Sequence, residues 1–200
     1  MYSSIGDLEN CLRAYEQVFL SEDADYSLKS VEKYYLLSIE HLENQKPYKN
    51  KKEFIQACRP FLDKLIGLAK EANTVNRQCL ISGIYKRMFI YRPSRDLLEL
   101  VKKHYYGAFM LMFKKTGEVN YYPYFNYLIT VVFLDQKLPE DTVMMSKKAL
   151  AYSMKEQDES SNLWSKIVSS FPLEIELLLS TKTSSIQKLK VKLLENFISA

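Results

Sequence analysis

Apolar residues recur every three or four positions in the first part of the chain, which is the spacing of one face of an amphipathic helix. Three segments show this pattern, and their apolar positions are Ile5, Leu8, Leu12, Tyr15 and Phe19, then Leu28, Val31, Tyr35, Ile39 and Leu42, then Phe54, Cys58, Phe61, Leu65 and Leu68. Pro60 interrupts the third segment. Because proline has no backbone donor, we expect a kink or a break into two helices there.

Capping residues mark the ends of further helices. Thr74 and Ser94 are suited to N-cap positions, and Gly117 to the left-handed residue that ends the second of these helices. Additional helices are expected within 141–157, 170–180 and 184–200. No segment alternates convincingly like a strand, and Gly and Pro are scarce, at five and six of 200 residues. The pattern predicts a single all-α domain over residues 1–200, with nine or ten helices in consecutive antiparallel pairs.

The segment VNYYPYFNYLITVVFL, residues 119–134, is the most apolar and aromatic part of the chain. Its sixteen uncharged residues are too few, and include too many polar ones, for a bilayer span of about 20 residues. A strand is disfavoured because Pro123 lacks a donor and no strand-like partner lies nearby. We therefore expect a central core helix that starts at Pro123, with an apolar face of Phe125, Leu128, Ile129 and Val132.

The opposite face of this expected helix carries a stripe of Tyr122, Asn126 and Thr130. In one interpretation Asn126 bonds to a neighbouring helix and the tyrosines bridge core and solvent. In the other, the stripe lines a ligand groove. The sequence leaves both open.

Charge and cysteine content narrow the class of protein. The net charge of +4 is small for a nucleic-acid-binding domain. Cys11, Cys58 and Cys79 are odd in number and far apart, which predicts reduced, mostly buried thiols in a cytoplasmic protein and no metal site. The N-terminal residues lack the basic and apolar regions of a secretory signal.

Part of the chain resembles a known family. Residues 80–89 (LISGIYKRMF), 97–109 (LLELVKKHYYGAF) and 120–134 (NYYPYFNYLITVVFL) are similar to the helices of tetratricopeptide-repeat (TPR) sensor proteins, related to the repeat region of some stress-activated kinase regulators. Small Gly107 and Ala108, with Tyr105 as a bulky neighbour, allow close helix packing. The likeness covers residues 74–134, and the flanks at 1–73 and 140–200 resemble repeats only in their periodicity. The first helix of an ordinary TPR carries Trp and Leu-Gly at characteristic positions, and this sequence departs from that signature.

The resemblance implies a right-handed TPR-like array that works by binding. It implies a nucleotide-derived ligand or a partner protein, and an associated effector such as a caspase-like peptidase, in bacterial signalling or antiviral defence. The candidate contact residues are Tyr85, Lys86, Arg87, Tyr122 and Asn126. The alternatives are a plain protein-interaction scaffold and, less favoured by the charge, a nucleic-acid-binding helical protein.

For the Tyr85-Lys86-Arg87 segment, an anion-binding patch competes with a solvated helix face whose side-chain stems pack on the core. The cluster at residues 102–107 adds His104, whose alternatives are a surface position and a catalytic role. Nothing at the right spacing completes a triad with it, and no Gly-rich phosphate loop, GxSxG or HExxH motif occurs. We expect neither enzymatic activity nor a cofactor.

Overall fold

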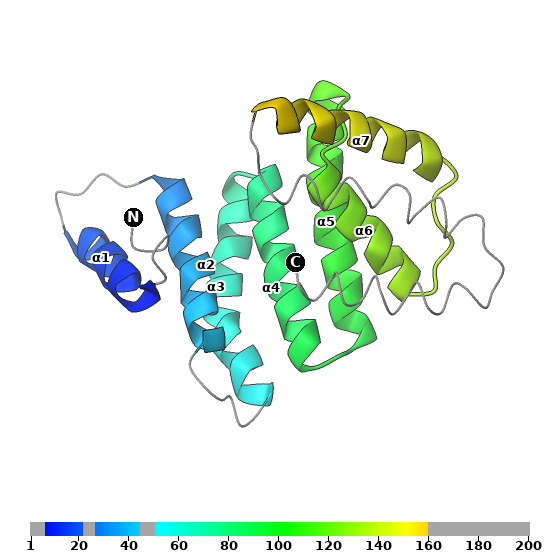
Figure 1. The fold of residues 1–200 in the computed structure, drawn as a ribbon. Coiled ribbons are helices and arrows are strands. Elements are labelled where there is room, and N and C mark those ends of the chain that lie inside the picture. The colour runs from blue at the N-terminus through cyan, green and yellow to red at the C-terminus, as the bar shows by residue number, and fades with distance from the viewer. Residues whose placement is uncertain (1–6, 22–26, 45–50, 160–200) are drawn as a thin grey trace. The chain divides into compact units, whose positions relative to one another are not determined.

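The computed structural model describes residues 7–21, 27–44 and 51–159. All regular structure in these ranges is helical, which confirms the all-α prediction (Figure 1). The helices expected within 170–180 and 184–200 lie outside the described residues. None of the helices that the structure describes combines the length and apolarity needed to cross a membrane.

Contacts within the chain divide it into two compact units. Unit 1 comprises the described residues of Met1–Asn73 together with Arg87–Pro93, and unit 2 those of Thr74–Lys86 and Ser94–Ala200. Helix α4 (Val75–Tyr91) therefore contributes residues to each unit.

Unit 1 contains α1 (Leu8–Leu20), α2 (Leu28–Asn44) and α3 (Lys51–Glu71). Helix α1 packs on α2, and α2 packs on α3, as the predicted helix pairs require. Leu12 and Cys11 of α1 are buried against Leu37 of α2. The aromatic ring of Phe19 meets the ring of Tyr34 edge to face, with their centroids 5.3 Å apart.

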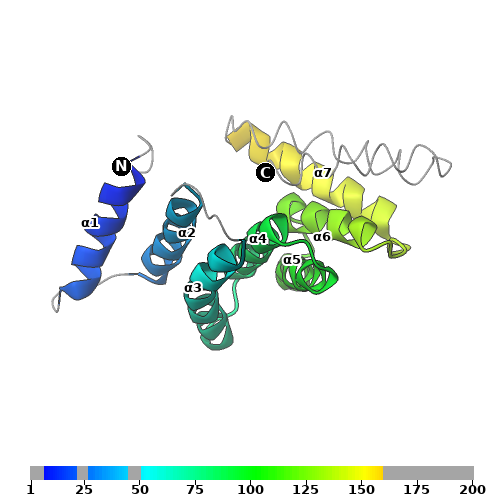
Figure 2. The same ribbon diagram turned by 90° about the horizontal axis from the view of Figure 1, so that it is seen from below.

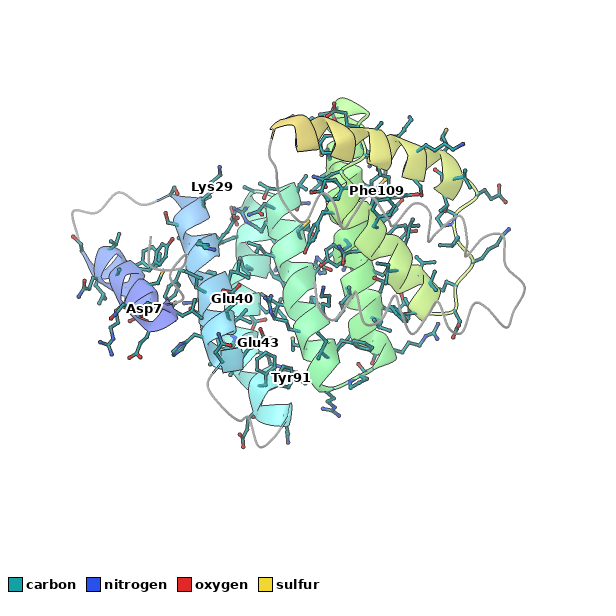
Figure 3. The ribbon with its side chains drawn as sticks, viewed as in Figure 1. Asp7, Lys29, Glu40, Glu43, Tyr91 and Phe109 are labelled. Carbon is teal, nitrogen blue, oxygen red and sulfur yellow. The ribbon has the colours of Figure 1, made fainter. Side chains whose placement is uncertain are left out.

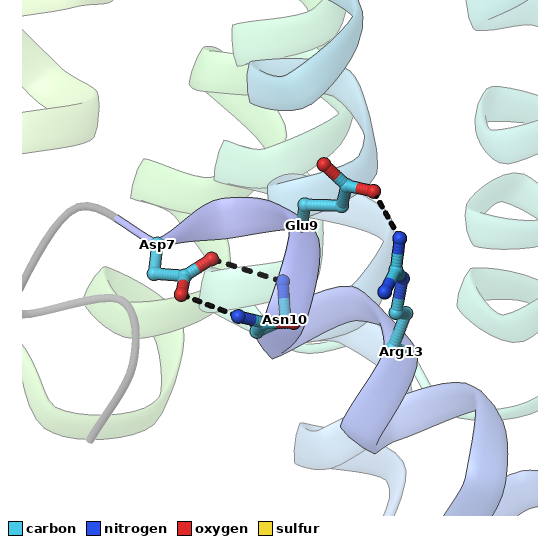
Figure 4. Close-up of polar contacts among 4 residues, drawn as sticks. All are labelled: Asp7, Glu9, Asn10 and Arg13. Carbon is cyan, nitrogen blue, oxygen red and sulfur yellow. Dashed lines mark hydrogen bonds and ion pairs between the residues drawn. The ribbon is translucent and has the colours of Figure 1, made fainter.

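Polar side chains fix the start of α1 (Figure 4). The Asp7 carboxylate accepts a hydrogen bond from the Asn10 backbone N–H at 3.1 Å and another from the Asn10 amide at 2.6 Å. Glu9 and Arg13, one turn apart, form an ion pair on the exposed surface. The cap satisfies a backbone donor and is worth about 1 kcal/mol, whereas an exposed pair of this kind adds only about 0.3–0.5 kcal/mol.

Helix α3 does not break at Pro60, so of the two predicted outcomes, a kink or a break into two helices, the break is wrong. The helix runs without interruption from Lys51 to Glu71 with Pro60 inside it. Pro60 is exposed, whereas Phe54, Cys58 and Leu65 of the predicted apolar face are buried. The buried face therefore keeps the helix continuous despite the lost donor.

Unit 2 contains the first part of α4, then α5 (Arg95–Thr116), α6 (Tyr121–Phe133) and α7 (Thr142–Glu159). The predicted caps are confirmed. Thr74 Oγ1 accepts from the Arg77 N–H, Ser94 caps α5, and Gly117 ends α5 in the left-handed region with a φ of 71°. Figure 2 shows α6 between α5 and α7, and α6 makes extensive contact with α5.

Residues 121–133 form a core helix, as the sequence predicts. The helix begins at Tyr121, two residues before Pro123, because Asn120 is the N-cap and accepts a hydrogen bond from the Tyr122 N–H at 3.0 Å. Proline fits the first turn of a helix, where its missing donor costs nothing. The buried residues of α6 are Pro123, Tyr124, Phe125, Asn126, Leu128, Ile129, Thr130 and Val131.

Gly107 lies inside α5 and Gly117 ends it, and substitution by alanine should change stability in opposite directions at these two positions. A Cβ added to Gly107, inside α5, would come no closer than 3.5 Å to another atom, the Oε1 of Gln78. We therefore expect Gly107→Ala to raise the free energy of unfolding by about 0.5–1 kcal/mol, the usual gain in a helix interior. Gly117→Ala should lower it by about 1–2 kcal/mol, because the φ of 71° disfavours a Cβ. Urea denaturation of both variants measures the two effects, and equal signs would contradict this account.

Candidate functional site

Unit 2 carries a groove of about 610 Å³ along one face of α5. That volume lies within the usual range for small-molecule sites. Its lining residues are Lys102, Lys103, Tyr106, Phe109, Met110, Phe113, Tyr124, Tyr127, Pro139, Asp141 and Met145.

Four aromatic rings form the centre of the groove, and we call Tyr106, Phe109, Tyr124 and Tyr127 the aromatic cup. The ring centroids of Tyr106 and Tyr127 are 5.1 Å apart, those of Tyr127 and Tyr124 6.5 Å, those of Tyr124 and Phe109 5.0 Å, and those of Phe109 and Tyr106 6.1 Å. The rings thus close a circuit between α5 and α6. Their planes are tilted by 41–59° at each contact.

Helical spacing brings these side chains together. Tyr106, Phe109 and Phe113 are three, four or seven residues apart on α5 and so share a face. Phe109, labelled in Figure 3, is buried, whereas Tyr106 is 44% exposed. Tyr124 is also buried, and its hydroxyl donates to the backbone carbonyl of Thr142 at 3.3 Å. Tyr124 and Phe109 therefore form the floor, and Tyr106 is open to a ligand.

The charge of Lys102 is already neutralised within the fold. Its ammonium forms an ion pair with Glu99 and donates to Gln136 Oε1 at 2.9 Å, while the Gln136 amide donates to Glu99 at 3.0 Å. Gln136 reaches this position because the chain turns sharply after α6 through Asp135, whose φ is 56°. The hydrogen bond and charge of Lys102 lower the pKa of Glu99, so the Glu99 carboxylate stays ionised at neutral pH.

Asp141 and Lys103 also line the groove, and neither forms an ion pair with any residue that the structure describes. Burial raises the pKa of Tyr124 to about 12, and the negative charge of Asp141 contributes to this increase. Burial, the neighbouring Tyr106 and the charge of Asp141 also raise the pKa of Tyr127. The Asp141 carboxylate is therefore close enough to act on two rings of the cup.

Tyr122 and Asn126, two of the predicted contact residues, lie on α6. Tyr122 is 38% exposed, and its ring meets that of Tyr105 edge to face at 5.9 Å. The buried Asn126 amide donates to the Tyr122 carbonyl at 2.8 Å, and Thr130 Oγ1 donates to the Asn126 carbonyl at 2.5 Å. These bonds to the helix's own backbone correct the expectation that Asn126 bonds to a neighbouring helix. Neither residue lines the groove.

Tyr85 and Lys86, in the unit 2 part of α4, are both buried. The ring of Tyr85 stacks on that of His104 with centroids 5.5 Å apart. The burial of Lys86 excludes a solvated position for this side chain.

Arg87, by contrast, belongs to unit 1. Its Nε donates to Glu43 at 3.0 Å, and its Nη2 lies 3.9 Å from Glu40 (both glutamates are labelled in Figure 3). An anion would have to displace these carboxylates from the guanidinium. A ligand-binding role for the five predicted residues stays a prediction.

His104 is half-buried. Its Nδ1 lies 2.7 Å from Gln78 Oε1, and its ring stacks on Tyr85. Burial, assisted by the charge of Lys103, lowers the pKa of His104 to about 4. The imidazole is therefore neutral at physiological pH, and its contacts are those of a packed side chain.

The described residues show no cluster of three or more His, Cys, Asp or Glu side chains that could hold a metal ion. Burial raises the pKa values of Cys58 and Cys79 to about 12, so both remain thiols at neutral pH and are poor nucleophiles. The groove itself presents aromatic faces and isolated charges, which suits binding.

Comparisons with protein-family models, curated proteins and solved structures find no match to this chain.

His104 makes stability depend on pH. Its pKa is about 6.5 in the unfolded chain and about 4 in the folded protein, so the unfolded state binds more protons between these values. Stability should consequently fall as pH is lowered from about 6.5 towards 4, by at most about 1.4 kcal/mol per pH unit from this residue. Urea denaturation across this range, compared with His104→Gln, measures the contribution. Two results would contradict the lowered pKa of His104. One is an unchanged pH dependence of stability in His104→Gln, and the other is an NMR titration of the His104 imidazole near pH 6.5.

Proposed function

We propose that the chain is a non-enzymatic sensor or adaptor module, in which the groove of unit 2 holds a ligand and its occupancy regulates an associated effector. The observation that supports this most strongly is the aromatic cup, with Tyr106 exposed above a buried floor of Phe109 and Tyr124. Exposed aromatic faces in a concave site are available to a ligand, and covering them removes apolar surface from water, which favours binding.

We also propose that the helix pairs belong to a TPR-like right-handed array, in a cytoplasmic protein of bacterial defence signalling. The support is the sequence resemblance at 74–134 and the packing of α1 on α2, α2 on α3 and α5 on α6. In this proposal the effector is a co-encoded protein such as a caspase-like peptidase. A ligand bound among α5, α6 and α7 would favour one packing of these helices over another, and a partner would read that packing.

A protein-interaction scaffold is the second candidate function. Val143 and Met144 on α7 are 41% and 52% exposed, and they precede Met145, which lines the groove. A partner polypeptide could cover these apolar side chains together with Tyr106. Co-purification of a partner without any added small molecule would favour this function.

Two variants with similar exposure test the sensor proposal. Tyr106 lines the groove, whereas Tyr122 lies outside it, and their exposed fractions are 44% and 38%. A thermal-shift screen of the wild type should include nucleotides and cyclic nucleotides, the class that the resemblance implies. A ligand at a hundredfold excess over its Kd stabilises by about 2.7 kcal/mol, which raises Tm by several degrees.

We expect Tyr106→Ala to abolish the Tm shift and Tyr122→Ala to retain it. The reverse result would place the site at the residues predicted from the sequence. If no screened ligand shifts Tm and no partner is retained in a way that depends on Tyr106, the proposed function fails.

A further inference from the structure

We infer that the aromatic cup binds a small organic cation, of the alkylammonium or trimethylammonium class. This inference rests on the proposed function, because it assumes that the groove is a ligand site, and it adds the chemical class of the ligand. Three features of the cup support it: the tilt of its rings, the charge of Asp141 beside them and the neutralisation of Lys102.

The tilt of the rings distinguishes a compact cation from a flat ligand. A planar base is held best between rings that are nearly parallel, since both faces of the base then make contact. In the cup, Tyr106 and Tyr127 are inclined by 47°, and Phe109 and Tyr124 by 52°. The accessible rings of the circuit are those of the exposed Tyr106 and the half-buried Tyr127, and because they are inclined to each other both can contact one roughly spherical group. The faces carry the negative part of the ring quadrupole and attract a cation.

A negative charge acts on two tyrosines of the cup. Asp141 lines the groove, forms no ion pair with a described residue, and influences the hydroxyls of both Tyr124 and Tyr127. A bound ammonium group would be the counterion of this carboxylate.

The two lysines of the lining do not oppose a cation at the cup to the same degree. The ammonium of Lys102 is held by Glu99 and Gln136, so its charge is compensated. The charge of Lys103 acts on His104, which lies outside the cup. Lys103 itself has no ion pair among the described residues, so we place the cation beside Tyr124 and Tyr127, the two rings on which the charge of Asp141 acts.

The size of the groove favours a free small molecule. About 610 Å³ is ample for a trimethylammonium group together with a short polar tail. The tail would extend from the cup along the α5 face, either towards Lys102 or towards Phe113.

The experiment compares choline with its neutral tert-butyl analogue, in which carbon replaces the charged nitrogen. The two have nearly the same shape, so the comparison isolates the charge. Calorimetric titration of the full chain should show choline binding about 2- to 30-fold more tightly than the analogue, the range expected for a cation–π interaction. Equal affinities, or tighter binding of the neutral analogue, would overturn the inference.

Adjacent acidic residues provide matched variants. Asp141→Asn should weaken choline binding several-fold and leave the neutral analogue unchanged. Glu140 is 94% exposed in its side chain and pairs with Lys137 outside the groove, so Glu140→Gln should bind both compounds as the wild type does. Tyr106→Leu keeps an apolar side chain but removes the ring, and it should reduce the preference for the charged compound. Retention of the full preference in both Asp141→Asn and Tyr106→Leu would contradict the assignment of the site.

Two further arms separate this inference from the proposed function. If a nucleotide binds and Tyr106→Ala abolishes its binding while choline does not bind, the cation inference is wrong and the sensor proposal stands. If only a peptide carrying trimethyl-lysine binds, the small-molecule assignment is overturned and the groove is a peptide site. If none of these probes binds and no partner depends on Tyr106, both proposals fail.

Discussion

The packing of α6 against its neighbours is the constraint on which unit 2 depends. Residues 121–133 are apolar on nearly every side, so the helix is stable in water only when other helices cover it. Helix α5 covers one side and α7 contacts another. The polar residues within α6 fit this environment because Asn126 and Thr130 donate to backbone carbonyls one turn earlier. The Asn126 amide and the Thr130 hydroxyl are thus satisfied without a partner from another helix.

The candidate site is a consequence of that packing. When α5 and α6 lie together, aromatic residues of both helices meet at one edge of their contact, and the start of α7 brings Asp141 to the same place. Phe109 and Tyr124 are held in the core, and this burial fixes the floor of the cup. The hydrogen bond from Tyr124 to Thr142 joins α6 to the first turn of α7. The proposed binding surface and the hydrophobic core therefore share the same side chains, so a ligand in the groove would act directly on helix packing.

The charged groups of the molecule have different surroundings, and this changes which of them are available to a ligand. Arg87 is held by Glu40 and Glu43, and Lys102 by Glu99 and Gln136. Both belong to short basic segments that could serve as anion sites when considered as sequence alone. Arg87 reaches glutamates on another helix, whereas Lys102 pairs with Glu99 on its own helix and is held there by Gln136 from beyond α6. The contacts with Glu40, Glu43 and Gln136 depend on which helices become adjacent. Asp141 belongs to no motif and makes no ion pair with a described residue. Its carboxylate is therefore the acidic group that the groove lining offers to a ligand.

The sequence by itself determined the all-α class, the caps at Thr74, Ser94 and Gly117, and the helical nature of residues 121–133, because helix periodicity and capping are local properties. The aromatic face of α5 at Tyr106, Phe109 and Phe113 was present in the sequence as i, i+3, i+7 spacing, but a core face has the same spacing. Only the tertiary structure decided that Tyr106 is exposed and Tyr105 buried, and that Arg87 pairs with two glutamates. It also decided that Asp141 lines the same groove as the four aromatic rings. These outcomes depend on contacts between residues far apart in the chain, and spacing along the sequence cannot specify which helix covers which face.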